Sequence, residues 1–532
     1  MVFSSTVFLF LFLPIVLIAY RFIPKTKITA QNIFLLLVSS VFYYYGEQQN
    51  ILLLYFVVFI NYLCGLMVYS GCTEETLRLE SERSAACLLQ QNADDLIKPK
   101  TKMQKFWMAA CVGTCIGLLW YFKYFNFTLL ILSCLFTDGV APKLADIALP
   151  LGISFYTFHV LSYSLDVYFG RMRAEKNLLN FASYVLMFPQ LVAGPIVRYR
   201  DIYHQFYHRT VTGAGFVNGS RRFCFGLAKK VLIANTLSEY ADQIFAIAPR
   251  QLSMTDCWAG AVAYTLQIYF DFSGYSDMAI GLALLFGFHY KENFNYPYMA
   301  KSCGEFWHRW HISLSTWLRD YVYIHMGGSR GSAFKTCRNV LFVFFCSGLW
   351  HGANVTFVCW GLLYGIFIVL EYLGLKRVLQ NLPLFSHIYL LLIAVTGWVM
   401  FRADSMAYAQ EFIANMYGLG RNGFSVGLTQ EIANNVLFFL IVGAFLSYDW
   451  RLLYKRFILH IAGKDRFENA LASIRNEANA ENMLQIKRGF VKLHKTITIT
   501  RIISYLYAIV LLILSSASIV SNSHNPFIYF RF

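Results

Sequence analysis

The chain has 532 residues, of which 57% are hydrophobic, 18% are aromatic and only 14% are charged. Soluble domains carry about 25% charged residues, so the composition argues against a soluble multidomain enzyme, a disordered protein and a disulfide-stapled secreted module. A mean hydropathy of +0.49 indicates a polytopic membrane protein. The formal net charge of +16 comes from bases that lie mostly between apolar runs. Lipid headgroups account for bases in such places, so nucleic-acid binding is not predicted.

The first apolar run covers residues 6–23, and Arg21, Lys25 and Lys27 lie at its end or just after it. No basic segment precedes the run and no small-residue cleavage site follows it. We therefore expect a retained first span rather than a signal peptide. The bases after the run predict that residues 21–29 lie in the cytoplasm.

Apolar runs long enough to cross a bilayer, which takes about 20 residues, recur along the whole chain. They cover residues 6–23, 30–46, 50–70, 106–135, 149–170, 180–196, 222–247, 257–287, 338–351, 354–375, 384–402, 433–449 and 502–521. Segments interrupted by Pro and Gly, such as 188–195, are expected to be re-entrant. The predicted fold class is all-α: a polytopic integral membrane protein of roughly 10–13 transmembrane or re-entrant helices that fills residues 1–532 as a single domain.

Two polar loops separate these runs. Residues 73–105 carry six acids and six bases, whereas residues 451–501 carry eleven bases and four acids. The basic excess predicts that the loop 451–501 lies on cytoplasmic lipid headgroups. Alternation through the first three spans predicts that the loop 73–105 is cytoplasmic too. The span 502–521 then carries the C-terminus to the outside.

Ionisable side chains gather among aromatic residues between about 268 and 352. Such groups are costly at membrane depth and usually face an interior cavity that carries function. His351 closes an apolar run and is flanked by Trp350 and Gly352. A neutral imidazole in this position can act as a general base. The alternative is a structural histidine whose ring is bound by a backbone carbonyl.

A second histidine, His311, lies in the stretch EFWHRWHISLSTWLRDY. On one continuous helix, Trp307, His311, Ser315 and Arg319 are four residues apart and would share a face. An imidazole, a hydroxyl and a guanidinium on one strip could orient a polar ligand. The alternative is an interfacial helix with aromatic anchors.

Other titratable groups give weaker signals. Asp271 and Asp277 could form a proton relay, or they could bond neighbouring Ser and Tyr hydroxyls and fix helix packing. The twelve cysteines contain no CxxC pair, and no Cys or carboxylate set completes a site around His308 and His311. No metal site and no disulfide framework are predicted.

Five segments of the chain, in the same order, resemble the characteristic segments of one protein family. The chain is similar to the membrane-bound O-acyltransferases, within the bacterial branch that acts in alginate and other polysaccharide O-acetylation. The segments are LPLGISFYTFHVLSYSLDVY (149–168), FPQLVAGPIVRY (188–199), FDFSGYSDMAIGLALLFGF (270–288), FWHRWHISLSTWLRDYVYI (306–324) and LWHGA (349–353). The similarity runs over most of the chain. One departure is His325, which stands where relatives usually have Pro.

The resemblance implies an acyltransferase with its catalytic core at about 149–375 and a central acyl-transfer cavity. It implies transfer of an acetyl group from a cytoplasmic thioester, such as acetyl-CoA, across the bacterial inner membrane. The acceptor would be an extracytoplasmic polysaccharide such as alginate, peptidoglycan or cellulose. The resemblance implies no bound cofactor. It does imply contact with membrane lipid and a separate extracytoplasmic partner that is a transferase or resembles an esterase.

The family's WHG histidine falls on His351, the implied catalytic base, and its second histidine falls on His311. Around them we expect a substrate-binding lining that consists of Trp307, Ser315, Arg319, Trp350 and Tyr275.

Three alternatives remain open at this stage. One is D-alanyl transfer to teichoic acid, whose donor comes from a carrier protein. Another is a secondary transporter that uses Asp271 and Asp277 as coupling residues, although no internal repeat supports it. The third is a scaffold that only recruits a partner. Replacement of His351 separates an enzyme from a scaffold.

Overall fold

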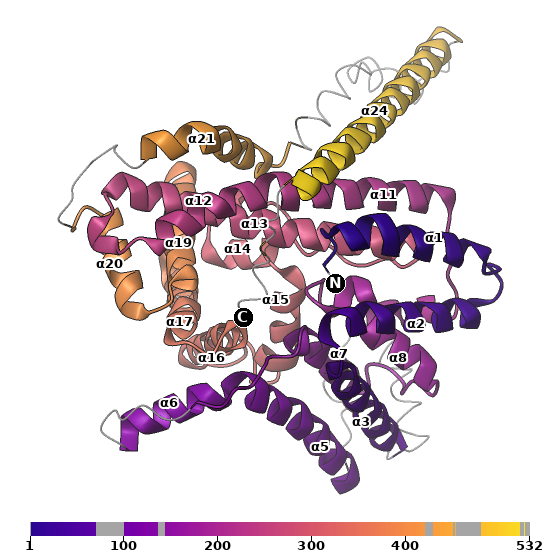
Figure 1. Ribbon diagram of the computed structural model, residues 1–532, viewed down its shortest axis with the longest axis horizontal. Helices are drawn as coiled ribbons and strands as arrows, with labels where there is room; N and C mark the ends of the chain where they lie inside the picture. The colour runs from indigo at the N-terminus through magenta and orange to yellow at the C-terminus, as the bar shows by residue number, and fades with distance from the viewer. Residues whose placement is uncertain are drawn as a thin grey trace.

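A computed structural model describes residues 2–70, 101–136, 144–420, 429–450, 453, 480–521 and 526. Every regular element in this part of the chain is a helix (Figure 1). The all-α prediction is therefore confirmed. Most of the loop 73–105, most of the loop 451–501 and all but one residue of the C-terminal tail lie outside the described residues.

The first half of the chain supplies helices of very different lengths. In chain order they are η1 Phe8–Phe12, α1 Leu13–Phe22, α2 Ile28–Glu47, α3 Asn50–Ser70, α5 Lys102–Leu119, η3 Trp120–Tyr124, α6 Phe125–Phe136, α7 Ile153–Tyr168, α8 Leu178–Leu186, α9 Phe188–Leu191, α10 Tyr199–Ile202, η4 Tyr203–Phe206, α11 Gly213–Ala228, η5 Lys229–Ala234 and α12 Asn235–Ala246. The expected re-entrant segment 188–195 is a short helix followed by an irregular turn, and all its residues are buried.

The second half contains the longest helix of the core, the 32-residue Met254–Leu285. Its elements are η6 Pro249–Gln251, α13 Met254–Leu285, η7 Pro297–Met299, α14 Cys303–Arg309, α15 Ile312–Leu318, η8 Arg319–Tyr323, α16 Ala333–His351, α17 Val355–Leu370, η9 Glu371–Leu375, α18 Lys376–Asn381, α19 Pro383–Arg402, α20 Met406–Met416, α21 Thr429–Leu446 and α24 Ala480–Ser521. In Figure 1, α11, α12 and α13 cross the molecule together, and the inner end of α24 lies against α11.

Long apolar helices make this a multi-pass membrane protein. Six helices among the described residues are long and apolar enough to cross a bilayer: Ile28–Glu47, Asn50–Ser70, Lys102–Phe136, Val355–Asn381, Pro383–Arg402 and Thr498–Ser521. Large apolar side chains on their outward faces are exposed, among them Leu37, Leu52, Ile116, Ile366 and Ile513. A soluble surface rarely tolerates so many exposed apolar groups, whereas lipid covers them.

The core forms where small residues let helices approach closely. Gly226 of α11 faces Gly274 of α13, and a Cβ atom added to Gly226 would lie 2.6 Å from the Gly274 carbonyl oxygen. Gly219 of α11 and Gly281 of α13 make the same close contact about two helical turns away. Small residues drive helix association in membranes because close backbone packing replaces the missing hydrophobic effect. These contacts hold α13 at the centre, beside the elements that carry the two histidines.

Candidate active site

His351 is the last residue of α16, and its place is set by a close helix pair. Gly352 leaves the helix in an extended conformation, and the Asn354 side chain then accepts from the Thr356 amide to start α17. A Cβ atom on Gly348 would collide with the Phe357 carbonyl oxygen of α17. The Gly348 contact therefore fixes α16 against α17 one turn before His351. The WHG sequence is thus a helix end followed by a sharp reversal.

The His351 ring is enclosed by aromatic rings and is 4% exposed. Its centroid lies 4.8 Å from Trp350, 4.9 Å from Trp360 and 5.1 Å from Phe401. His351 also lines a cavity of about 270 Å³, with lining residues Gly46, Glu47, Lys123, Leu149, Pro150, Leu151, Gly152, Ile153, Ser154, Phe155, Val192 and Trp350. The imidazole is therefore buried in the fold and still borders a space that a reacting group can enter.

A second cavity of about 440 Å³ lies beside the first. Gly352, Ala353 and Asn354 line it directly after His351 in the chain. Its wall carries an ion pair in which Arg402 donates to Asp242 over 2.7 Å. Lys123 borders both cavities. The chain segment that carries His351 thus has accessible space on two sides.

His311 lies at a break between two helices, which corrects the predicted continuous helix. α14 ends at Arg309 and α15 begins at Ile312, while His311 adopts the left-handed backbone conformation with φ 41°. The chain breaks here because the Ile312 amide donates to the Asn293 carbonyl over 2.9 Å instead of continuing the helix. Trp307, Ser315 and Arg319 therefore do not form one strip with His311.

The break aims the His311 ring into the core. Its Nδ1 lies 3.2 Å from the Asn293 side-chain oxygen, which also accepts from the Ser313 hydroxyl. The ring is fully buried and packs edge-on against Phe272 at 4.6 Å. Its centroid is 6.1 Å from Trp350, the neighbour of His351. Both histidines therefore flank the same tryptophan, and a left-handed non-glycine residue held this way is typical of functional sites.

An aromatic column leads from Trp350 toward α15. Phe158 of α7 stacks on Trp350 at 5.4 Å and on Trp317 at 4.2 Å. The Trp317 indole also donates to the Phe158 carbonyl over 3.2 Å. Tyr321 follows at 5.0 Å from Trp317. The column connects the histidine region with a cluster of charged residues at the far end of α7.

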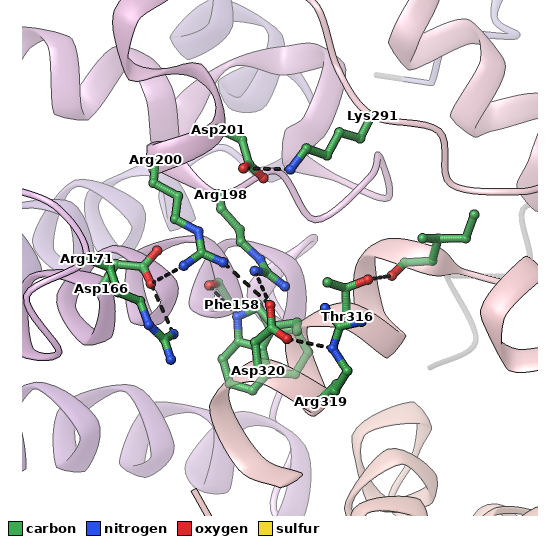
Figure 2. Close-up of polar contacts among 12 residues, drawn as sticks. Phe158, Asp166, Arg171, Arg198, Arg200, Asp201, Lys291, Thr316, Arg319 and Asp320 are labelled. Atoms are coloured by element: carbon green, nitrogen blue, oxygen red, sulfur yellow. Dashed lines mark hydrogen bonds and ion pairs between the residues drawn. The ribbon is translucent and has the colours of Figure 1, made fainter. Parts of the chain in front are cut away.

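This cluster, the arginine cluster, consists of Arg171, Arg198, Arg200, Arg319, Asp166 and Asp320. Figure 2 shows Arg200 between the two carboxylates, 3.2 Å from Asp166 and 3.5 Å from Asp320. Arg198 donates to Asp320 over 2.7 Å, and Arg171 lies 3.5 Å from Asp166. The cluster joins the end of α7, the segment after the re-entrant turn, and η8.

Arg319, an expected substrate-binding residue, belongs to this cluster. Its side chain is 55% exposed and donates to Asp320 over 2.7 Å. Burial raises the pKa of the Asp320 carboxyl, but hydrogen bonds from Arg319 and Arg198 outweigh burial and hold that pKa below its usual range. Ser315 is also away from the cavity beside His351, with its hydroxyl 3.5 Å from the Trp310 carbonyl. Neither Arg319 nor Ser315 lines either of the two cavities. His311 itself is buried and lines neither of the two cavities.

The other three expected lining residues, Trp350, Trp307 and Tyr275, also differ in whether they border the cavity beside His351. Trp350 lines the cavity beside His351. Trp307 packs edge-on against Trp360 at 5.6 Å, so it supports a ring that touches His351. Tyr275 stacks on Phe3 at 4.6 Å, between the N-terminal segment and α13. Of the three, Trp350 is the one that borders the cavity.

Asp271 and Asp277, for which the sequence left open a proton relay or bonds to Ser and Tyr hydroxyls, are paired with cations. Asp271 lies 2.7 Å from the Lys230 ammonium, and both side chains are buried. Asp277 accepts from Lys229 and from Arg222. Compensated charges of this kind join α11 and η5 to α13. The pairs strengthen the packing role of these aspartates.

Sequence reasoning missed Lys123, Asn293 and Phe158. Lys123 had a usable signal, because it is a charge within the apolar run 106–135 and charges at membrane depth are functional candidates. Asn293 and Phe158 had no comparable signal. Their importance comes from contacts across the fold, with His311 and with Trp350.

A known protein family matches the part of the chain that forms this site. Residues 35–403 match the membrane-bound O-acyltransferase family. The chain belongs to this family. The matched range contains both histidines, both cavities' walls up to Ala403, and the arginine cluster. The chain is therefore a membrane-bound O-acyltransferase, as its resemblance implied.

Individual relatives carry names from three kinds of polymer chemistry. The chain is 38% identical over 541 residues to the "probable alginate O-acetylase AlgI" of Azotobacter vinelandii, which covers 100% of both chains. It is 34% identical over 360 residues to the peptidoglycan O-acetyltransferase of Helicobacter pylori, covering 61% of this chain and 66% of that one. It is 27% identical over 228 residues to the teichoic acid D-alanyltransferase of Bacillus subtilis, covering 41% and 57%.

Proposed function

We propose that this O-acyltransferase transfers an acetyl group from a cytoplasmic thioester to a hydroxyl of an extracytoplasmic polysaccharide. Similarity over the full length of an alginate O-acetylase supports acetyl transfer and an alginate-like acceptor. The shorter similarity to a teichoic acid D-alanyltransferase gives less support to D-alanyl transfer. The observation that carries the proposal is His351, buried at a helix end and bordering a cavity.

The proposed reaction uses His351 as the general base. An acceptor hydroxyl in the cavity gives its proton to an imidazole nitrogen while its oxygen attacks the thioester carbonyl carbon. The new C–O bond forms, the C–S bond breaks, and the leaving sulfur takes the proton from the imidazolium. Acetyl-CoA is the thioester we expect, and no step needs a bound cofactor. Trp350 borders the cavity and orients the reacting groups, and the buried His311 supports Trp350 from behind.

The two ends of α7 support opposite entry routes for the substrates. Bases at Arg21, Lys25 and Lys27 predict a cytoplasmic end for α2, so Glu47 at its other end faces outward. Glu47 and Ile153 line the cavity beside His351, which favours acceptor entry from outside. α7 runs from Ile153 to Tyr168, so the arginine cluster faces the cytoplasm.

The proposal also assigns a compartment and partners. We propose the bacterial inner membrane, with an extracytoplasmic transferase that takes part in the final step on the polysaccharide. The relatives named for alginate and peptidoglycan acetylation come from bacteria. Membrane lipid covers the exposed apolar faces of the helices.

Mass spectrometry of exported and cell-wall glycans, with and without the gene, tests this function. We expect ester-linked acetate on one exported glycan to disappear on deletion and to return with the wild-type gene. A complementing gene that encodes His351→Ala should not restore it. Loss of ester-linked alanine instead of acetate would replace the acetyl proposal with D-alanyl transfer.

A further inference from the structure

The last carbonyl groups of α16 are bound by two consecutive residues from a distant helix. The final carbonyls of a helix have no partner within it. The Tyr124 hydroxyl donates to the Leu349 carbonyl over 2.8 Å. The Lys123 ammonium donates to the Trp350 carbonyl over 2.5 Å and lies 3.4 Å from the His351 carbonyl. Three carbonyls in a row, ending at the proposed base, are thus held from outside.

A local irregularity lets adjacent residues reach the same target. Lys123 and Tyr124 lie in η3, a π-helical turn inserted between α5 and α6. Such single π turns widen the helix and often occur at functional sites. Lys123 also reaches Ser154 of α7, with 3.4 Å between the ammonium and the hydroxyl. One side chain therefore connects three helices at the cavity.

The location of Lys123, beside the C-terminus of α16 and bordering two cavities, indicates a specific role for its charge. Lys123 lies within the 35-residue candidate span Lys102–Phe136. A cation is favourable at a helix C-terminus, because the free carbonyls there carry partial negative charge. Lys123 lines both cavities, one of which is also lined by Gly352 and the other by His351.

We propose that Lys123 is a positioning residue that holds His351 in its reactive orientation, with Tyr124 as its helper. This inference rests on the proposed role of His351 as the base. Binding the carbonyls of Leu349, Trp350 and His351 fixes the backbone that carries the imidazole. A base displaced by about 1 Å loses about 100-fold in rate. Lys123 therefore acts on the chemical step rather than on substrate affinity.

The test uses permeabilised membranes of the native host in which each variant replaces the wild-type chain, so that the proposed extracytoplasmic partner is present. The donor is [¹⁴C]acetyl-CoA and the acceptor is unacetylated alginate oligomers. Lys123→Met keeps the length of the side chain and removes its charge and donors. We expect kcat per folded molecule to fall about 100-fold, with KM for both probes within about threefold. Lys123→Arg keeps a cationic donor and should recover kcat to within about tenfold of wild type.

Two further variants keep the test decisive if Lys123→Met is poorly folded. Tyr124→Phe removes a single hydroxyl, and we expect a fall in kcat of about fivefold, the effect of one hydrogen bond. Lys105→Met is the matched control, because Lys105 is an exposed lysine of the same helix, and its kcat should not change.

The outcomes separate this inference from the proposed function. Normal kcat in folded Lys123→Met, or an equal loss in Lys123→Met and Lys123→Arg, overturns the positioning role. A change confined to KM overturns it as well. The same assay on His351→Ala checks the base: activity in that variant refutes the proposed function, whereas its inactivity beside an active Lys123→Met refutes the inference alone.

Discussion

The region around His351 and the arginine cluster lie at opposite ends of one aromatic column and are built in opposite ways. His351 is surrounded by Trp350, Trp360 and Phe401, and the Lys123 ammonium lies 3.4 Å from its carbonyl oxygen. The cluster instead places four guanidinium groups around two carboxylates. A base needs a dry and precisely oriented site, whereas paired charges fix the relative positions of chain segments. We therefore expect the region around His351 to carry the chemical step and the arginine cluster to stabilise the fold.

The largest expected effect lies at the aromatic end. His351→Ala should lower acyl transfer by about 10²–10⁴-fold, the usual contribution of a general base. The protein should stay folded, because Trp350 and Trp360, which enclose the ring, keep their own aromatic contacts with Phe158 and Trp398. Acetylation is measured relative to the amount of protein in membranes. His325→Ala is the control, since that ring stacks on Phe169 away from the cavities. Near-normal acetylation in His351→Ala would withdraw the catalytic assignment.

The arginine cluster should respond in stability instead. Arg198→Leu removes a buried guanidinium that binds Asp320, and the free energy of unfolding should fall by about 3 kcal/mol. The loss stays at the low end because Arg200 and Arg319 still neutralise Asp320. Unfolding in SDS-containing mixed micelles measures it. The exposed pair Arg250–Glu411 provides the control, where Arg250→Leu should cost less than about 1 kcal/mol. Equal losses in the two variants would remove the framework role.

His311 tests how sharply the two regions divide. His311→Ala should reduce acyl transfer by about 10- to 100-fold, because a buried ring that holds Trp350 beside the cavity contributes less than the base itself. The exposed His308 in the preceding helix is the control, and His308→Ala should keep full activity. Transfer is measured with labelled acetyl-CoA in membranes. An effect as large as that of His351→Ala would indicate that both rings move protons.

Arg319 should show the smallest effect of the four. Its half-exposed side chain binds Asp320 and lines neither cavity. Arg319→Gln should therefore keep acyl transfer within about twofold of wild type, and the free energy of unfolding should change by less than about 1 kcal/mol. The same acetylation assay checks it. A large loss of transfer would restore Arg319 to the substrate-binding set and blur the division between the two regions.

The amino-acid sequence by itself determined that the chain lies in a lipid bilayer and that its fold is all-α. Long apolar runs with few charges can satisfy their backbone groups in lipid only as helices, so the all-α polytopic architecture could be predicted. The two histidines could be selected as well, because their motifs are local. His351 ends an apolar run, and its neighbours Trp350 and Gly352 are next to it in the chain.

Only the tertiary structure decided which side chains accompany those histidines. A spacing of four residues predicts one shared face only if the helix continues, and bonds from the distant segment around Asn293 interrupt it at His311. Arg319 consequently joins Asp320 and the arginine cluster. Lys123 reaches His351 across 228 residues of chain, and no local pattern encodes such a contact. Helix periodicity is a property of the sequence, whereas partners across the bundle are set by packing.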